Sequence, residues 1–262
     1  MFSQKISSPD DPSLVELCER LAELAREPDV SGDWPDAQLD LCGQYGVYEW
    51  FIEPEWGGQG WDCEAVVRGY LALSSACLTT TFILTQRSGA CRQIASSANE
   101  QLKKALLPQL AQGELFATVG ISHLTTSRRH LARPVLQAER VPGGFVLKGF
   151  SPWVTGAAHA QTVVLGATVI LDDQPTEEQL LAALPTDLPG VTTPPPAQLI
   201  GLTASHTGEL RLDGVFVEDQ WVLAGPVENV MLRSAGGGTG GYQTSALALG
   251  LARSAIDFLE SE

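Results

Sequence analysis

The sequence is short of positive charge and of long apolar runs. Its 262 residues include 16 Lys and Arg against 31 Asp and Glu, so the formal net charge is −15. A chain with so few cations forms no basic stripe to neutralise phosphates, which argues against nucleic-acid binding. It also has no uninterrupted apolar run of about 18 residues, so we expect no membrane-spanning segment. Residues 1–30 carry many charges and no apolar core, unlike a secretory signal peptide.

Closely spaced cysteine pairs are also missing. No two cysteines have the CxxC spacing, and the five cysteines are scattered through segments with helical character: Cys18, Cys42, Cys63, Cys77 and Cys91. This spacing disfavours the common zinc and dithiol motifs, so we expect no metal site. An odd number of thiols without a signal peptide is typical of a cytoplasmic protein with reduced cysteines.

Familiar catalytic motifs are absent as well. The sequence has no GxSxG, HExxH or Walker motif. Gly236–Gly241 formally matches GxGxxG, but no evident strand precedes it, so we interpret it as a hinge before the last helix. Ser205 and His206 are neighbours in sequence, which says nothing about a catalytic triad because triad residues meet in space. The basic cluster at residues 128–130 is most simply a solvated loop.

The first 114 residues are predicted to be helical. The composition, with 44% hydrophobic and 18% charged residues, is that of a globular chain. Helical character is expected in five stretches: 14–24, 35–45, 64–84, 86–97 and 98–113. Ser13 with Glu16, and Ser97 with Glu100, have the spacing of capping boxes at two helix starts. Pro108 is predicted to kink or break its helix.

After Glu114 the pattern changes to strands. Five segments are rich in β-branched residues or alternate with period two: 115–122, 133–141, 144–149, 161–171 and 208–218. The sequence Pro-Gly-Gly at 142–144 predicts a hairpin turn between two of them. Residues 172–200 resemble an acidic helical piece followed by a proline-rich loop, and residues 242–259 return to a helix. Helices, then antiparallel strands, then one helix make an α+β fold rather than a βαβ sheet.

The most informative segment is Trp153-Val154-Thr155, between two predicted strands. An indole can cover a flat conjugated ring, and a nearby threonine can hydrogen-bond the edge of that ring. The triplet therefore suggests a flavin pocket. Residue chemistry alone leaves open whether Trp153 faces a ligand or packs inside the protein. His123, at the end of a predicted strand, is most simply a structural or surface histidine.

Five landmarks follow one another in the order found in a known enzyme family. They are Glu53–Asp62 (EPEWGGQGWD), Ser97–Glu114, Val141–Ala160, Thr207–Pro226 and Ala246–Glu260. In this order and spacing they make the chain resemble the acyl-CoA dehydrogenase family over nearly its whole length. The last landmark is similar to the first helix of the family's C-terminal bundle.

The resemblance implies three domains. Residues 1–114 are expected to form a helical N-terminal domain, residues 115–226 an antiparallel β-barrel-like middle domain, and residues 227–262 the start of a C-terminal four-helix bundle. We expect that bundle to be truncated in this sequence. Family members are FAD-dependent enzymes, usually homotetramers, that oxidise acyl-CoA thioesters between the α and β carbons and pass electrons to a partner protein.

The resemblance also implies the site residues. Trp153 would lie against the flavin ring, Thr155 would hydrogen-bond its N5/O4 edge, and residues 119–122 would pass along the ring. The implied cofactor-binding residues are Val119, Ile121, Ser122, His123, Trp153 and Thr155. No catalytic residue is assigned. The family's glutamate base lies beyond Glu262 in most members and matches about Thr244 in others, and a threonine cannot take the proton.

A departure at residues 123–129 keeps other functions open. Where most dehydrogenases carry Thr-Glu-Pro and then Gly-Ser-Asp, this chain has His123-Leu124-Thr125 followed by TSRR. The change favours a flavin-dependent monooxygenase of the same fold, which takes reduced flavin from a partner reductase and needs no glutamate base. A third alternative is a degenerate, non-catalytic member that serves as a binding or assembly module.

Overall fold

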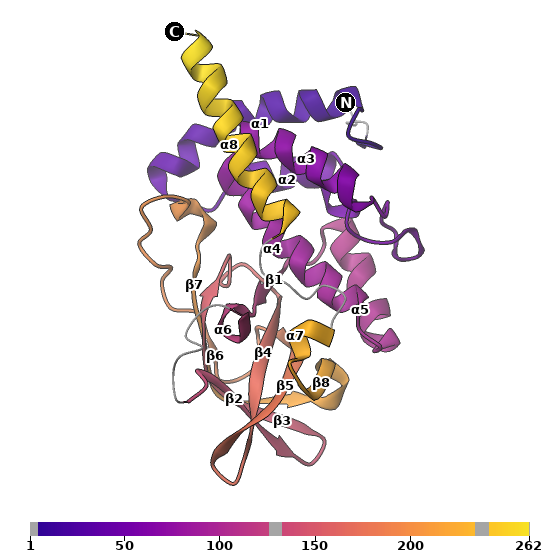
Figure 1. Ribbon diagram of the computed structural model, residues 1–262, viewed down its shortest axis with the longest axis vertical. Coiled ribbons are helices and arrows are strands. Elements are labelled where there is room, and N and C mark those ends of the chain that lie inside the picture. Colours follow the sequence, from indigo (N-terminus) through magenta and orange to yellow (C-terminus); the bar gives the residue numbers. More distant parts are fainter. Residues whose placement is uncertain (1–4, 126–132, 234–240, 262) are drawn as a thin grey trace.

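Helices gather at one end of the molecule and strands at the other. The structure, a computed structural model, describes residues 5–125, 133–233 and 241–261. Figure 1 shows the N-terminal helices in the upper part and the strands below them. The expected α+β fold, with a helical N-terminal half followed by a sheet, is confirmed.

Between residues 5 and 114, five helices and two 3-10 turns build the upper part. They are α1 (Pro12–Ser31), α2 (Asp36–Gln44), η1 (Val47–Glu49), η2 (Pro54–Trp56), α3 (Cys63–Ala76), α4 (Leu78–Ala95) and α5 (Glu100–Gln112). Apolar faces of these elements meet in a core that includes Leu17, Tyr45, Trp50 and Tyr70. Burial of this surface stabilises the helices, which would be marginal in isolation.

Two helix starts differ from the predicted ones. Asp11 Oδ1 accepts a hydrogen bond from Ser13 N (3.0 Å), and Asn99 Oδ1 accepts one from Leu102 N (3.1 Å). The capping boxes predicted at Ser13 and Ser97 are therefore wrong. The first N-cap is Asp11, two residues before Ser13, and the second is Asn99, two residues after Ser97. Aspartate and asparagine are both strong N-cap residues.

Within the helical part, the structure differs from the sequence prediction at two further points. The predicted helix 64–84 is divided into α3 and α4, because Cys77 has an extended backbone with φ of −151°. Pro108 lies inside α5 and does not break it. Leu106, Leu107 and Leu110 are buried on the inner face of this helix, and their packing outweighs the backbone hydrogen bond that the proline loses.

The strands form one mixed sheet. They are β1 (Ala117–Gly120), β2 (Leu136–Val141), β3 (Gly144–Val154), β4 (Thr162–Leu171), β5 (Gln174–Pro185), β6 (Val191–Thr192), β7 (Gly208–Glu218) and β8 (Val222–Glu228). Their order is β6-β7-β3-β2-β4-β5-β8, and β1 pairs with β4 off this path. The β1–β4 and β2–β4 pairs are parallel, and the others are antiparallel. Parallel strands need a long connection between them. Here β2 and β3 lie in the chain between β1 and β4, and β3 lies between β2 and β4.

Strand β5 overturns one prediction. Residues 174–185 form this strand, although the sequence predicts an acidic helical piece there. Leu181 pairs with Gly166 of β4 on one side and with Ala224 of β8 on the other. Residues 180–184 are all buried, so pairing and burial in the sheet outweigh the helical propensity of its Glu, Leu and Ala residues.

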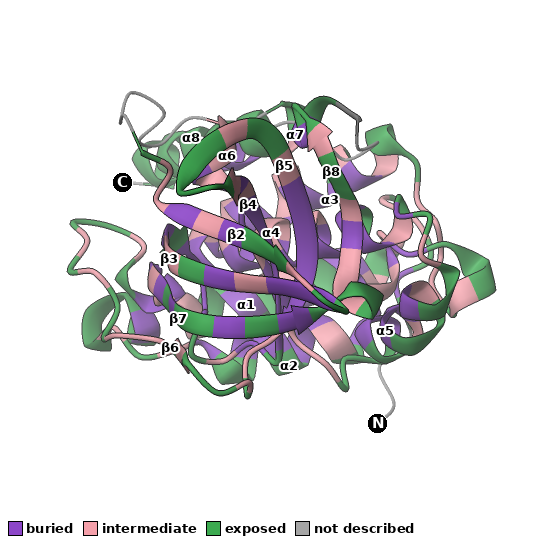
Figure 2. Cartoon of the chain, turned by 90° about the horizontal axis from the view of Figure 1, so that it is seen from below, coloured by how far each residue is buried: buried purple, intermediate pink, exposed green. Residues whose placement is uncertain are grey.

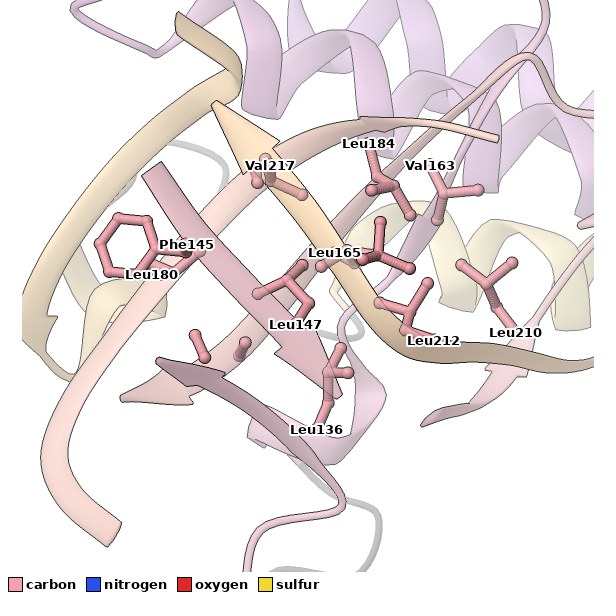
Figure 3. Close-up of a cluster of buried hydrophobic side chains, with 14 of the residues drawn as sticks. Leu136, Phe145, Leu147, Val163, Leu165, Leu180, Leu184, Leu210, Leu212 and Val217 are labelled. Atoms are coloured by element: carbon pink, nitrogen blue, oxygen red, sulfur yellow. The ribbon is translucent and has the colours of Figure 1, made fainter. Parts of the chain in front are cut away.

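The sheet curves around its own apolar core. Figure 3 shows side chains from β2, β3, β4, β5 and β7 that converge on one another, among them Leu147, Leu165 and Leu212. Along β7, buried and exposed residues alternate over most of the strand, which is visible as coloured bands in Figure 2. This alternation is typical of a strand with one face on a core and one face toward solvent.

The chain returns to the helical part at its C-terminal end. After α7 (Val230–Arg233), helix α8 (Tyr242–Ser261) packs on α3 through Ala246, Leu247 and Gly250. Ser74 Oγ donates to the carbonyl of Ala246 (3.2 Å). Within the described ranges, none of the helices has the length and apolarity needed to cross a bilayer.

Candidate functional site

Trp153 presents its indole at the surface, near the end of β3. The side chain is 47% exposed, whereas the flanking Pro152 and Val154 are buried. Alternation along the strand explains this, since neighbouring residues point to opposite faces. A large aromatic ring on the outer face leaves a flat apolar surface that a planar ligand can cover.

Thr155 follows with a buried hydroxyl. The residue is 3% exposed, and its Oγ1 lies 2.9 Å from Thr207 Oγ1. The chain then turns at Gly156, which has φ of +63° and where a Cβ atom would lie 2.5 Å from the Trp34 ring. The turn therefore requires glycine, and it fixes the place where β3 ends.

The end of β1 lies against the end of β3. A Cβ atom at Gly120 would lie 2.9 Å from Ser151 Oγ and 3.0 Å from Val154 Cγ2. This close approach brings Ser122, two residues later, toward the Trp153 end of β3. Ser122 and Ser151 both have a buried hydroxyl without a partner among the described residues.

The other implied residues of this segment face the protein. The methyl groups of Val119 would lie 3.4 and 3.7 Å from a Cβ at Gly89 of α4, so this side chain packs on the helix. Ile121 is 8% exposed and belongs to a buried apolar cluster. A ligand beside β1 would therefore meet the backbone of these residues rather than their side chains.

His123 is turned into the sheet. It lies in α6 (Ser122–Thr125), a short helical turn where the sequence predicts strand up to Ser122. His123 Nε2 donates to the carbonyl of Gly166 in β4 (2.7 Å), and burial lowers the pKa of the ring. These contacts support the structural role considered for this histidine, and contact with a cofactor stays a prediction.

Several buried polar atoms of β1, β3 and α6 lack partners in the part of the chain that the structure describes. Besides the hydroxyls of Ser122 and Ser151, Thr118 Oγ1 and His123 Nδ1 are buried without a partner among the described residues. Unpaired buried polar groups are costly, so they indicate a polar ligand or bound solvent. A half-exposed indole followed by a threonine hydroxyl matches a ring that is flat and apolar on its faces and polar along its edge.

A second polar cluster lies behind Thr155, between the helical part and the sheet. The Trp34 and His159 rings are stacked, with centroids 4.1 Å apart and an interplanar angle of 7°. His206 Nε2 lies 2.9 Å from the carbonyl of Gly32, and His206 Nδ1 lies 2.9 Å from His159 Nε2. Since a carbonyl only accepts, His206 donates through Nε2 and accepts from His159 through Nδ1.

Sequence reasoning missed Ser205, His206 and Thr207 as partners of the candidate site. Ser205 and His206 are adjacent in sequence and form no catalytic triad with the described residues; they contact the turn after Thr155 instead.

Thr244 lies exposed in the first turn of α8. The basic residues at 128–130 and Gly236 to Gly240 of the glycine run lie outside the described residues.

Comparisons with known proteins identify relatives of the chain. The family model described as "Acyl-CoA dehydrogenase, N-terminal domain" matches residues 16–114. The probable acyl-CoA dehydrogenase YngJ of Bacillus subtilis is 27% identical over 245 residues, which are 90% of this chain and 62% of that protein. The chain thus spans less than two thirds of the length of this relative.

Two solved structures share the fold. Butyryl-CoA dehydrogenase from Megasphaera elsdenii superimposes with a TM-score of 0.79 at 20% identity, over 93% of this chain and 66% of that one. The dibenzothiophene monooxygenase TdsC from Paenibacillus sp. A11-2, solved with FMN and indole, gives a TM-score of 0.77 at 19% identity, over 93% and 61%.

Proposed function

Because the chain belongs to the acyl-CoA dehydrogenase family, we propose that it binds FAD at Trp153 and Thr155 and acts in the α,β-dehydrogenation of an acyl-CoA thioester. One observation carries the proposal. A half-exposed indole lies at the end of β3, two residues before the buried hydroxyl of Thr155, and Ser122 and Ser151 of the adjoining α6 and β3 have buried hydroxyls without partners among the described residues.

The side chains named above have distinct tasks in this proposal. Trp153 covers one face of the ring and shields it from water, and the hydroxyl of Thr155 donates to an acceptor on its edge. Ser122 supplies a second hydroxyl, and Val119 and Ile121 supply backbone groups. His123 is included as a further contact on the strength of the family resemblance.

When bound, the flavin supplies the acceptor for the hydride that leaves the β-carbon of the substrate. We assign no base for the α-proton to the described residues, because Thr244 carries a hydroxyl that cannot take the proton. The task of this chain's own residues is to hold and orient the ring. Positioning of this kind is a large part of what a flavoenzyme contributes to the rate.

Partners follow from the same family resemblance. We propose an acyl-CoA or related thioester as substrate, a protein that accepts electrons from the reduced enzyme, and assembly into homo-oligomers. FAD rather than FMN is the proposed cofactor.

The proposal is tested by reconstitution. The purified chain is titrated with FAD and with FMN, and its visible spectrum is recorded. The reconstituted protein is then mixed with acyl-CoA thioesters of different length and a redox dye. We expect a yellow FAD complex and thioester-dependent dye reduction. A chain that takes up neither flavin contradicts the proposed site, and a yellow complex that reduces no dye with any thioester contradicts the dehydrogenase activity.

A second candidate is a flavin-dependent monooxygenase of the same fold. The residues His123-Leu124-Thr125, where most dehydrogenases carry other residues, favour it, and the fold is shared with TdsC. This candidate predicts oxygen consumption when reduced flavin is supplied, with no response to acyl-CoA. A non-catalytic member would give neither reaction.

A further inference from the structure

The hydroxyl of Thr155 is the end of a buried chain of three hydroxyls. Thr155 Oγ1 lies 2.9 Å from Thr207 Oγ1, which lies 2.8 Å from Ser205 Oγ. The three residues are 3%, 7% and 0% exposed in that order. Ser205 ends the turn η3 (Thr203–Ser205), and Thr207 immediately precedes β7, 52 residues after Thr155.

The donors and acceptors limit where the hydrogens can lie. Each hydroxyl has one hydrogen and can accept two, so the contacts run from Thr155 toward Ser205, from Ser205 toward Thr155, or from both Thr155 and Ser205 to Thr207. In the first ordering the hydrogen of Ser205 has no acceptor among the described residues, and in the third ordering the same holds for the hydrogen of Thr207, although both side chains are buried. A buried donor without a partner is costly. In the second ordering Ser205 donates to Thr207 and Thr207 to Thr155, and the hydrogen left unpaired within the described part of the chain is that of Thr155. This is the hydrogen that can donate to the proposed flavin, so the second ordering is the one that suits the flavin-bound protein.

This ordering leaves one hydrogen free. Thr155 accepts from Thr207, so its own hydrogen is available to a group outside the chain of hydroxyls. The acceptors along the edge of oxidised flavin suit a hydroxyl that is held as a donor. A threonine that can rotate would lose conformational entropy on binding the same edge.

The backbone holds Thr207 in this place. Gly156 N donates to the carbonyl of Ser205 (3.1 Å), so the turn after Thr155 is tied to the segment before Thr207. Leu202 and His206 have positive φ of 59° and 46° in that segment. Such conformations persist in non-glycine residues only where the surroundings hold them, and they are often found near functional sites.

We propose that Thr207, oriented by Ser205, is a positioning residue that holds the hydroxyl of Thr155 as a hydrogen-bond donor toward the flavin. The inference rests on the proposed function, because it requires a flavin beside Trp153 and Thr155. Thr207 acts through Thr155 and does not itself contact the ring.

The test compares Thr207→Val with Thr207→Ser. Valine keeps the shape of threonine and removes the hydroxyl, whereas serine keeps the hydroxyl. We expect the dissociation constant for FAD to rise about fivefold in Thr207→Val, with a shift of the flavin visible spectrum, and to stay within about twofold of wild type in Thr207→Ser. Wild-type affinity and spectrum in Thr207→Val would overturn the inference.

A double variant separates positioning from a general loss of structure. If Thr207 acts only through Thr155, then Thr155→Val with Thr207→Val binds FAD as weakly as Thr155→Val alone. Fully additive losses would overturn the inference. Circular dichroism shows whether Thr207→Val is folded. If it is not, Ser205→Ala takes its place, and an unchanged spectrum and affinity in that variant would overturn the inference as well.

The wild-type titration distinguishes the two proposals. If wild type binds no FAD, the proposed function and this inference fail together. If wild type binds FAD and Thr207→Val binds it equally well, only the inference fails and the proposed function stands.

Discussion

The guanidinium of Arg87 lies over the ring of Tyr48, 3.9 Å from its centroid, in the interior of the helical part. Arg87 is 1% exposed, and its Nη2 donates to the carbonyl of Leu110 near the end of α5. Tyr48 in turn donates its hydroxyl to the carbonyl of Leu39 (2.7 Å). One buried cation thus joins α4 to α5 and to the turn η1, through a cation–π contact and a charge-assisted hydrogen bond.

We expect Arg87→Ala to destabilise the protein by about 3 kcal/mol, because it leaves a cavity and removes the charge-assisted hydrogen bond to the carbonyl of Leu110. The free energy of unfolding is measured by urea denaturation. Arg92→Ala is the matched control, since Arg92 is exposed on the same helix and its removal costs less than about 1 kcal/mol. Equal losses in the two variants would contradict the role given to Arg87.

The contact between α8 and α3 depends on Gly250. A Cβ atom there would lie 1.9 Å from Ser74 Oγ and 2.8 Å from the carbonyl of Leu71. We expect Gly250→Ala to destabilise this contact by about 2 kcal/mol, although alanine favours a helix over glycine. Hydrogen exchange of the α8 amides measures the effect. Ala248→Val, at an exposed neighbouring position, should leave the exchange nearly unchanged, and a gain in protection in Gly250→Ala would contradict the prediction.

Local patterns in the sequence predict much of the fold. Strand β7 occupies residues 208–218 as predicted, because apolar and polar residues alternate over most of its length and place one face on the core. Gly113 ends α5 in the left-handed conformation, with φ of 75°, as a glycine after a helix indicates. Strand β5 could not be predicted in this way, since residues 174–185 have helical propensity and become a strand only through pairing with β4 and β8.

The candidate site also has parts that the sequence predicts and parts that it does not. Trp153 and Thr155 lie within one short segment, so their chemistry could be recognised in the sequence. Thr207 and His206 reach the site from a segment about 50 residues later, and no spacing rule connects the two. The approach of Gly120 to Ser151 is likewise a property of strand packing. The parts that escaped prediction are therefore the tertiary contacts that support the site.

We expect stability to fall as the pH is lowered through the histidine range. Burial and the neighbouring His206 lower the pKa of His159 from 6.5, with Asp36 acting in the opposite direction, and burial lowers the pKa of His123. A lowered pKa means that the unfolded chain binds more protons than the folded one. The stabilising contribution is thus complete above about pH 7 and is lost as the pH falls below about 6.5.

His159→Gln tests this dependence. Glutamine can still donate to His206 but does not titrate, so the loss of unfolding free energy between pH 7 and about pH 5.5 should become smaller than in wild type. Urea denaturation at a series of pH values measures both proteins. Carboxylates contribute equally to the two curves, so they cancel in the difference. An identical pH dependence in the two proteins would exclude His159 as a contributor.

Trp153 should matter for cofactor affinity and little for stability. Its side chain is 47% exposed, so Trp153→Ala removes little buried surface, and we expect a change in unfolding free energy within about 1 kcal/mol. Loss of the aromatic face should weaken FAD binding about tenfold. Trp50→Phe is the control for stability. Trp50 is fully buried and stacks on Trp61, with ring centroids 4.1 Å apart. That variant should lower the melting temperature and leave the FAD affinity of the folded protein unchanged. A Trp153→Ala protein with a large loss of stability and full FAD affinity would identify Trp153 as a packing residue and remove the central support for the flavin site.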